Sequence, residues 1–151
     1  MISGSRPKRA DGLIRKDSNM KALIVEDEMT SRIILENILK HFGEVHVCID
    51  GHEAIESFGA DLNKGAPFDI VCMDFMMPEI DGHMALRMIR AMEKDMGISR
   101  ENGVKVIMTT GLSNIESEYE DIPTLCDAIL LKPIRKAALV DCLRKLGFSK
   151  D

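Results

Sequence analysis

Four short polar segments, each directly after an apolar run, carry the side chains best suited to chemistry. They are Glu26-Asp27-Glu28, Asp74, Thr109-Thr110 and Lys132-Pro133. Crowded carboxylates repel one another, and a divalent cation such as Mg²⁺, which prefers oxygen ligands, removes that repulsion. A carboxylate can also attack phosphorus and form an aspartyl phosphate. A transferred phosphoryl group carries negative charge on its oxygens, so a nearby lysine ammonium and hydroxyl would stabilise it. These residue types therefore predict phosphoryl chemistry assisted by Mg²⁺.

Strand-like and helix-like segments alternate along the chain and must position these side chains. Apolar runs predict strands at 22–25, 45–49, 68–73, 104–108 and 128–131. Helical spacing of apolar residues predicts helices at 30–42, 52–62, 84–96 and 137–146, with a short acidic helix at 114–121. Gly43 and Gly147 are expected to end the first and last helices as C′ glycines.

This alternation predicts an α/β fold with a parallel sheet covered by helices on both faces. In open α/β sheets, ligands bind outside the carboxyl ends of the strands. All four polar segments follow predicted strands, so we expect them to meet at one edge of the sheet. Each segment alone is more typical of a helix cap or a solvated loop, but capping does not readily explain the series of four.

Composition narrows the class of protein. The chain has 151 residues, of which 45% are hydrophobic and 30% charged, which is typical of one globular domain. Its net charge of −5 disfavours direct nucleic-acid binding, which needs clustered Lys and Arg. No apolar run approaches the roughly 18 residues of a membrane span, and the N-terminus lacks the apolar core of a secretory signal. We therefore expect a cytoplasmic protein without membrane contact. Three of the four cysteines lie in apolar runs, where buried thiols are ordinary core residues, and no disulfide framework is expected.

The polar N-terminal residues 1–19 show no periodicity and are predicted to form a flexible tail. Met20 directly precedes the first strand-like run, so it is a candidate for the natural start, with the tail non-native or upstream of that start. The remaining residues 20–148 are predicted to form a single domain.

The four segments, read in order, resemble those of the response-regulator receiver domains of two-component signal transduction. The resemblance is carried by Glu26-Asp27 after LIV, MDFMMPEIDG at 73–82, VIMTTG at 106–111 and LKPI at 131–134. It covers roughly residues 20 to 148. It implies a doubly wound, flavodoxin-like (βα)5 fold with strand order 2-1-3-4-5, in a stand-alone receiver similar to the chemotaxis receiver.

The resemblance also implies a metal site. Asp27, Asp74 and the backbone carbonyl of Met76 would ligate Mg²⁺ directly, and Glu26 would act through a metal-bound water. Mn²⁺ would be able to replace Mg²⁺. The first acidic residue of the family is often aspartate, and the longer Glu26 should still reach the water shell.

Three further residues would contact or receive the phosphoryl group, according to the same resemblance. Asp74 would be the phosphoacceptor, Thr110 the switch hydroxyl and Lys132 a contact to a phosphoryl oxygen. Pro133 would follow a cis peptide bond, and Gly82 would permit the tight loop behind the acceptor.

The sequence departs from the family at positions that affect the switch. Ile129 stands where many members carry a rotating Tyr or Phe, so the usual relay from hydroxyl to ring is in doubt. Gly111 replaces the usual Ala after the switch hydroxyl. Met76 and Leu112 occupy positions that tune dephosphorylation, and neither can orient a water by hydrogen bonding. We therefore expect a long-lived phosphoryl state.

The expected function is phosphorelay signalling rather than enzymatic turnover of a substrate. The partners would be a histidine kinase or histidine phosphotransfer protein and an unknown downstream protein. Phosphorylation should shift the segment 114–121, in which Tyr119 is either a partner contact or an uninvolved exposed residue. The chain is expected to be a stand-alone receiver, a relay shuttle or a module of a longer protein, monomeric or dimeric on phosphorylation.

Three rival hypotheses are weaker. A phosphatase of the haloacid-dehalogenase type also uses an Asp nucleophile and Mg²⁺, but needs a carboxylate two residues later, where this chain has Met76. A degenerate receiver would lack the acceptor or the lysine, yet Asp74 and Lys132 are present. A nucleotide-binding domain would show a glycine-rich phosphate loop, and neither common motif occurs.

Overall fold

The computed structural model describes residues 20–149, so the predicted tail 1–19 lies outside the described residues. Its centre is a five-stranded sheet in the order β2-β1-β3-β4-β5, in which every neighbouring pair is parallel. The strands are β1 Met20–Val25, β2 Gly43–Cys48, β3 Ile70–Asp74, β4 Lys105–Thr110 and β5 Ala128–Leu131. The predicted parallel sheet and its strand order are confirmed.

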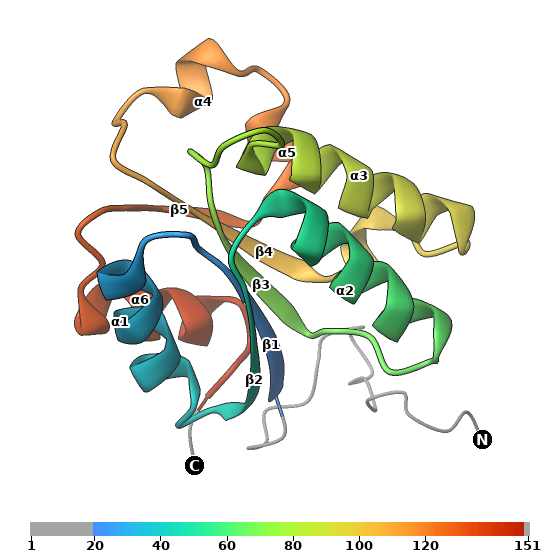
Figure 1. Ribbon diagram of the computed structural model, residues 1–151, viewed down its shortest axis with the longest axis horizontal. Coiled ribbons are helices and arrows are strands. Elements are labelled where there is room, and N and C mark those ends of the chain that lie inside the picture. Colours follow the sequence, from blue (N-terminus) through green and yellow to red (C-terminus); the bar gives the residue numbers. More distant parts are fainter. Residues whose placement is uncertain (1–19, 150–151) are drawn as a thin grey trace.

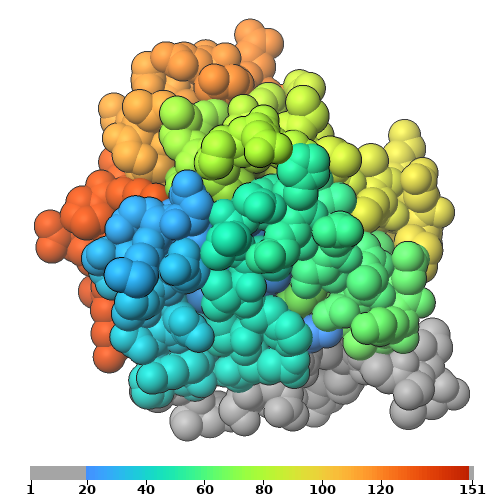
Figure 2. Space-filling view, viewed as in Figure 1, coloured from blue at the N-terminus to red at the C-terminus, as the bar shows by residue number. Residues whose placement is uncertain are grey.

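Helices cover both faces of this sheet (Figure 1). They are α1 Met29–Leu39, α2 Gly51–Asn63, α3 Gly82–Asp95, α4 Ile115–Glu118, α5 Ile122–Leu125 and α6 Lys136–Lys145, with a 3-10 turn η1 at Arg100–Asn102. One face packs against α1 and α6, and the other packs mainly against α2 and α3, with α4 and α5 contributing apolar contacts. In the space-filling view, the atoms of α1 and α2 leave little of β1 visible (Figure 2).

The two hydrophobic cores explain why β1 and β3 are apolar without alternation. Every residue of both strands is buried. Leu23 and Val25 point into the core beneath α2 and α3, whereas Ala22 and Ile24 point into the core beneath α1 and α6. A strand that is buried on both faces needs apolar residues at odd and even positions alike.

Two local predictions differ from the structure. Helix α1 ends at Leu39, and Gly43 opens β2 instead of capping the helix. A Cβ atom at Gly43 would collide with the backbone oxygen of Met20, its partner across the sheet, so the glycine is needed for a close backbone approach. The helix predicted at 114–121 has only one turn, and a second short helix, α5, follows it.

The cysteines lie in the core without disulfide bonds. All four cysteines are free and buried, and burial raises the pKa of the Cys72 thiol to about 12. No helix among residues 20–149 combines the length and the apolar character needed to cross a membrane.

Candidate functional site

The parallel topology brings the four polar segments together at the carboxyl edge of the sheet. Asp74 is the last residue of β3 and lies directly opposite Thr109 of β4. On the other side of β3, Val25 pairs with Met73, which places Glu26 one step further along, beside Asp74. The backbone N–H of Lys132 donates to the Thr110 carbonyl at 2.7 Å, so the lysine segment continues the same edge.

Three of the predicted residues form a compact carboxylate cluster. Oxygens of Glu26, Asp27 and Asp74 all lie within 4.8 Å of one another. Glu26 and Asp74 are buried, whereas Asp27 is exposed. Two buried carboxylates and an exposed one at this spacing fit a hard divalent cation, because its charge removes their repulsion and each offers oxygen ligands. The side chains present therefore fit Mg²⁺.

Lys132 reaches over this cluster from the end of β5. Its Nζ lies 2.9 Å from Glu26 Oε1 and 3.3 Å from Asp74 Oδ2. Burial would lower the pKa of Lys132, but the two carboxylates outweigh it and hold the pKa above its usual value. The ammonium is therefore firmly charged. The Lys132–Pro133 peptide bond is cis, as predicted.

Glu26 is the most deeply buried acid of the cluster, with a fully buried side chain. Burial raises its pKa, and the contact with Lys132 opposes that rise without cancelling it. The 2.9 Å contact is an ion pair whose direction does not make a good hydrogen bond at Oε1. This carboxylate oxygen therefore keeps a lone pair for a further ligand, such as a metal-bound water.

The loop after Asp74 shapes the surroundings of its carboxylate. Met76 N–H donates to Asp74 Oδ1 at 3.2 Å, and Gly82 N–H donates to the Phe75 carbonyl at 3.0 Å. A Cβ atom at Gly82 would come within 2.9 Å of the Phe75 Cα, so this glycine is needed for close packing. The Met76 side chain is exposed, and its carbonyl stays a predicted metal ligand.

Thr110 lies at the same edge, but its hydroxyl is directed to its own loop. Its Oγ1 accepts a hydrogen bond of 2.9 Å from Leu112 N–H. Nothing lies within 4 Å of a Cβ atom at Gly111, so the residue after Thr110 has free space around it. The role of Thr110 as a contact to a phosphoryl group stays a prediction.

Two residues at the acidic segment have contacts that the sequence did not assign to them. Glu28 is the N-cap of α1, where it accepts from the Ser31 hydroxyl, Ser31 N–H and Thr30 N–H, and these bonds lower its pKa to about 2. Arg32 Nη1 donates to the carbonyls of Glu26 and Asp27 at 3.1 and 3.3 Å, which braces the acidic loop. The sequence feature that could have indicated both contacts is the position of the acidic triplet, which directly precedes a predicted helix.

An aromatic cluster next to Asp74 was also missed from sequence. The Tyr119 ring lies 5.0 Å from the Phe75 ring and 5.1 Å from the His83 ring. His83 contacts Asp121 at 2.7 Å, and Arg87 forms an ion pair with the same carboxylate at 2.7 Å. The segment after β4 is thus held against the residue that follows Asp74, and Tyr119 is half-buried rather than freely exposed.

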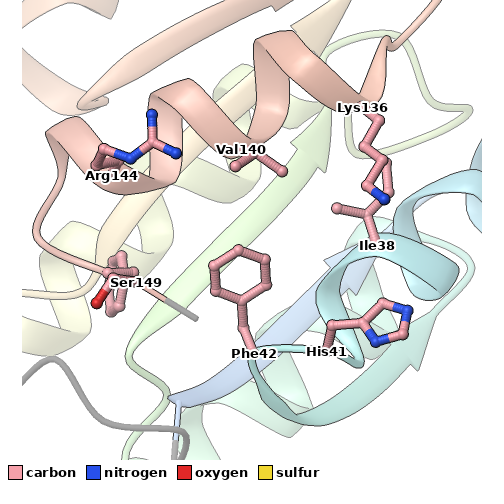
Figure 3. Close-up of a pocket in the computed structure, with 8 residues that line it drawn as sticks. Ile38, His41, Phe42, Lys136, Val140, Arg144 and Ser149 are labelled. Atoms are coloured by element: carbon pink, nitrogen blue, oxygen red, sulfur yellow. The ribbon is translucent and has the colours of Figure 1, made fainter. Parts of the chain in front are cut away.

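A cavity of about 260 Å³ lies elsewhere, between the end of α1 and α6. Figure 3 shows Phe42 and Val140 on opposite sides of it, with Lys136 and Arg144 toward its two ends. None of the predicted site residues lines this cavity. The chemistry of the acidic edge is therefore separate from it.

Comparison with known proteins agrees with this geometry. A family model described as the response regulator receiver domain matches residues 22–144. The histidine kinase CKI1 of Arabidopsis thaliana is 33% identical over 131 residues, which cover 80% of this chain and 11% of that kinase. The chain spans 6–11% of the length of four histidine kinases that it matches.

Solved structures show the same fold. The receiver domain of the A. thaliana kinase CKI1, crystallised with Mg²⁺, superposes with a TM-score of 0.71 at 30% identity, covering 87% of this chain and 96% of that one. A chain from the Saccharomyces cerevisiae co-crystal structure of the phosphotransfer protein Ypd1 with the receiver domain of Ssk1 gives a TM-score of 0.70 at 25% identity. That match covers 85% of this chain and 89% of the other.

Proposed function

Given that this chain belongs to the response-regulator receiver family, we propose that Asp74 is the residue that accepts the phosphoryl group. The observation that carries the proposal is the environment of this carboxylate. Asp74 is buried, lies within 4.8 Å of two other carboxylates and has the Lys132 ammonium 3.3 Å away. Phosphoryl transfer needs carboxylates that hold a cation, next to a fixed positive charge, and this site provides both.

A divalent cation would be held by Asp27, Asp74 and the carbonyl of Met76, with Glu26 acting through a water. Mg²⁺ suits these oxygen ligands, and Mn²⁺ should replace it. When bound, the cation supplies positive charge to the phosphoryl oxygens. The burial of Glu26 and the exposure of Asp27 support this division, because the exposed carboxylate is the one a hydrated ion reaches first.

In the transfer step, an Asp74 carboxylate oxygen forms a bond to phosphorus while the bond from phosphorus to the donor histidine nitrogen breaks. The released imidazole keeps that electron pair and takes up a proton. Met76 N–H orients Asp74 through Oδ1. Lys132 moves from the carboxylates to a phosphoryl oxygen, and Thr110 exchanges its bond from Leu112 N–H for one to the phosphoryl group.

The donor would be a histidine kinase or a histidine phosphotransfer protein in the cytoplasm. The match to a receiver crystallised with such a protein supports the second kind of donor. Output would pass by protein–protein contact, from a monomer or a phosphorylation-dependent dimer. The domain would catalyse at most its own phosphorylation and dephosphorylation, and it would not turn over a separate substrate.

The test is intact-mass spectrometry after incubation with acetyl phosphate, with and without Mg²⁺. The wild type should gain the mass of one phosphoryl group only with Mg²⁺, and Asp74→Asn should gain none. Asp95→Asn, an exposed change at the far end of α3, is the matched control and should behave as the wild type. A mass gain that persists in Asp74→Asn would assign the acceptor to another residue.

A further inference from the structure

Two buried oxygens flank Asp74 without a hydrogen bond. Among the side chains that the structure describes, only Glu26 Oε1 and Thr109 Oγ1 are buried and lack a hydrogen-bond partner. Both belong to the row that contains Asp74, Glu26 on the side of β1 and Thr109 on the side of β4. The two buried oxygens without a hydrogen bond therefore lie at the same sheet edge, on either side of Asp74.

The two oxygens differ in how the proposed function accounts for them. Glu26 Oε1 already faces the Lys132 ammonium and would complete its bonding with a metal-bound water. Thr109 has no such role, although its side chain is fully buried. An unpaired buried hydroxyl destabilises the folded state, and a valine of similar shape would avoid that cost. An unsatisfied group of this kind calls for a functional explanation.

The path of the Lys132 side chain supplies a functional explanation for the unpaired Thr109 hydroxyl. Leu130 of β5 pairs with Thr109 of β4, and Lys132 follows two residues later, on the same face of the sheet. Its ammonium nevertheless contacts Asp74 and Glu26, which lie beyond β4. The side chain therefore crosses the end of β4 on the face where Thr109 stands.

Hydrogen-bond capacity agrees with this placement. A lysine ammonium has three N–H donors, and its ion pairs with Glu26 and Asp74 leave at least one of them for a further acceptor. The Thr109 hydroxyl offers an acceptor beneath the side chain. The hydroxyl of Thr110, the next residue, accepts from Leu112 N–H. Of these two hydroxyls, that of Thr109 is the one without a hydrogen-bond partner among the described residues.

We propose that Thr109 is a positioning residue for Lys132. Its hydroxyl accepts an ammonium N–H when Lys132 leaves Glu26 and contacts the phosphoryl group on Asp74. The role rests on the proposed function of Asp74 and extends it to a residue that touches neither metal nor phosphoryl oxygen. The unphosphorylated protein tolerates the unpaired hydroxyl, and the phosphorylated one gains its bond.

Two variants separate the hydroxyl from the rest of the side chain. Thr109→Val removes the hydroxyl and keeps the shape, whereas Thr109→Ser keeps the hydroxyl and removes the methyl group. Thr109→Val should raise the melting temperature of the unmodified protein by roughly 2–4 °C. It should slow phosphorylation by acetyl phosphate about five- to tenfold, the loss of roughly one hydrogen bond. Thr109→Ser should stay within about twofold of the wild-type rate.

A double-mutant cycle tests whether the effect runs through Lys132. In a Lys132→Met background, Thr109→Val should cause no further slowing. Thr124→Val, which removes a hydroxyl that bonds only within its own turn, is the control and should leave the rate unchanged.

Three results would overturn the role of Thr109. They are a wild-type rate in Thr109→Val, equal slowing in Thr109→Ser, or undiminished slowing by Thr109→Val in the Lys132→Met background. A wild type that takes up no phosphoryl group would instead overturn the proposed function, and this role with it.

Discussion

The Lys132 ammonium lies 3.3 Å from the Asp74 carboxylate, although β4 separates the strands from which the two residues come. The same ammonium is 2.9 Å from Glu26. Without a cation, this one positive charge is what offsets two buried carboxylates. The Lys132 ammonium therefore neutralises the carboxylates that a divalent cation would also bind. The ammonium and the cation compete for the same oxygens.

This competition predicts that Lys132→Met binds Mg²⁺ more tightly than the wild type. Removing one positive charge a few ångströms from the site should strengthen binding by at least about 1 kcal/mol, or roughly fivefold, because two unit charges at such a distance interact by about that much even at the dielectric of water. Calorimetric titration with MgCl₂ measures the change. Lys136→Met, which removes an exposed lysine from α6, is the control. Equal affinity in wild type and Lys132→Met would contradict the competition.

The main features of the site followed from sequence because a parallel sheet collects its strand ends. Asp74, Thr110 and Lys132 each come directly after or at the end of an apolar run. Once the alternation of strands and helices is recognised, topology alone places them at one edge. Their approximate positions needed no knowledge of side-chain packing.

The features that were missed depend on contacts between distant elements. Residue type alone does not separate Glu26, which is buried beside Asp74, from Glu28, which caps α1, because that difference depends on where the helix starts. The bonds from Arg32 to the acidic loop depend on the direction of its side chain. The packing of Tyr119 on Phe75 joins two segments that share no local pattern.

Gly82 should be the least replaceable glycine of the site. A Cβ atom there would come within 2.8 Å of the Met108 side chain and 2.9 Å of the Phe75 backbone. Gly82→Ala should therefore lower the free energy of unfolding by about 1–3 kcal/mol, the usual cost of overpacking. Gly111→Ala, at an open position, should change it by less than about 0.5 kcal/mol. Urea titration compares the two, and an equal loss in both would contradict the packing argument.

The lifetime of the phosphoryl group should depend on Met76. Its side chain is 59% exposed at the mouth of the site, where an apolar group cannot orient a water for attack on phosphorus. Met76→Asn should hydrolyse its phosphoryl group about tenfold faster, equivalent to one modest hydrogen bond in the transition state. Met84→Asn, another exposed methionine nearby on α3, should match the wild type. Loss of the wild-type phosphoryl group within seconds, as followed by intact mass, would contradict the expected slow hydrolysis.

Tyr119 should report the state of Asp74 by its fluorescence. The chain has one tyrosine and no tryptophan, so the emission comes from a single ring. That ring packs 5.0 Å from Phe75, whose N–H donates to the Thr109 carbonyl beside Asp74. Ile129 provides no ring on β5, so the Phe75–Tyr119 contact is the aromatic contact that joins the residue after Asp74 to the end of α4.

Adding Mg²⁺ and beryllofluoride, a phosphoryl mimic, should therefore change the Tyr119 emission. The change should fall by about half or more in Phe75→Leu, which removes the ring through which the two segments touch while keeping a similar apolar volume. Tyr119→Phe provides the blank. An emission change of full size in Phe75→Leu would show that the signal reaches α4 by another path. No change in the wild type with the mimic bound would show that α4 is not coupled to Asp74.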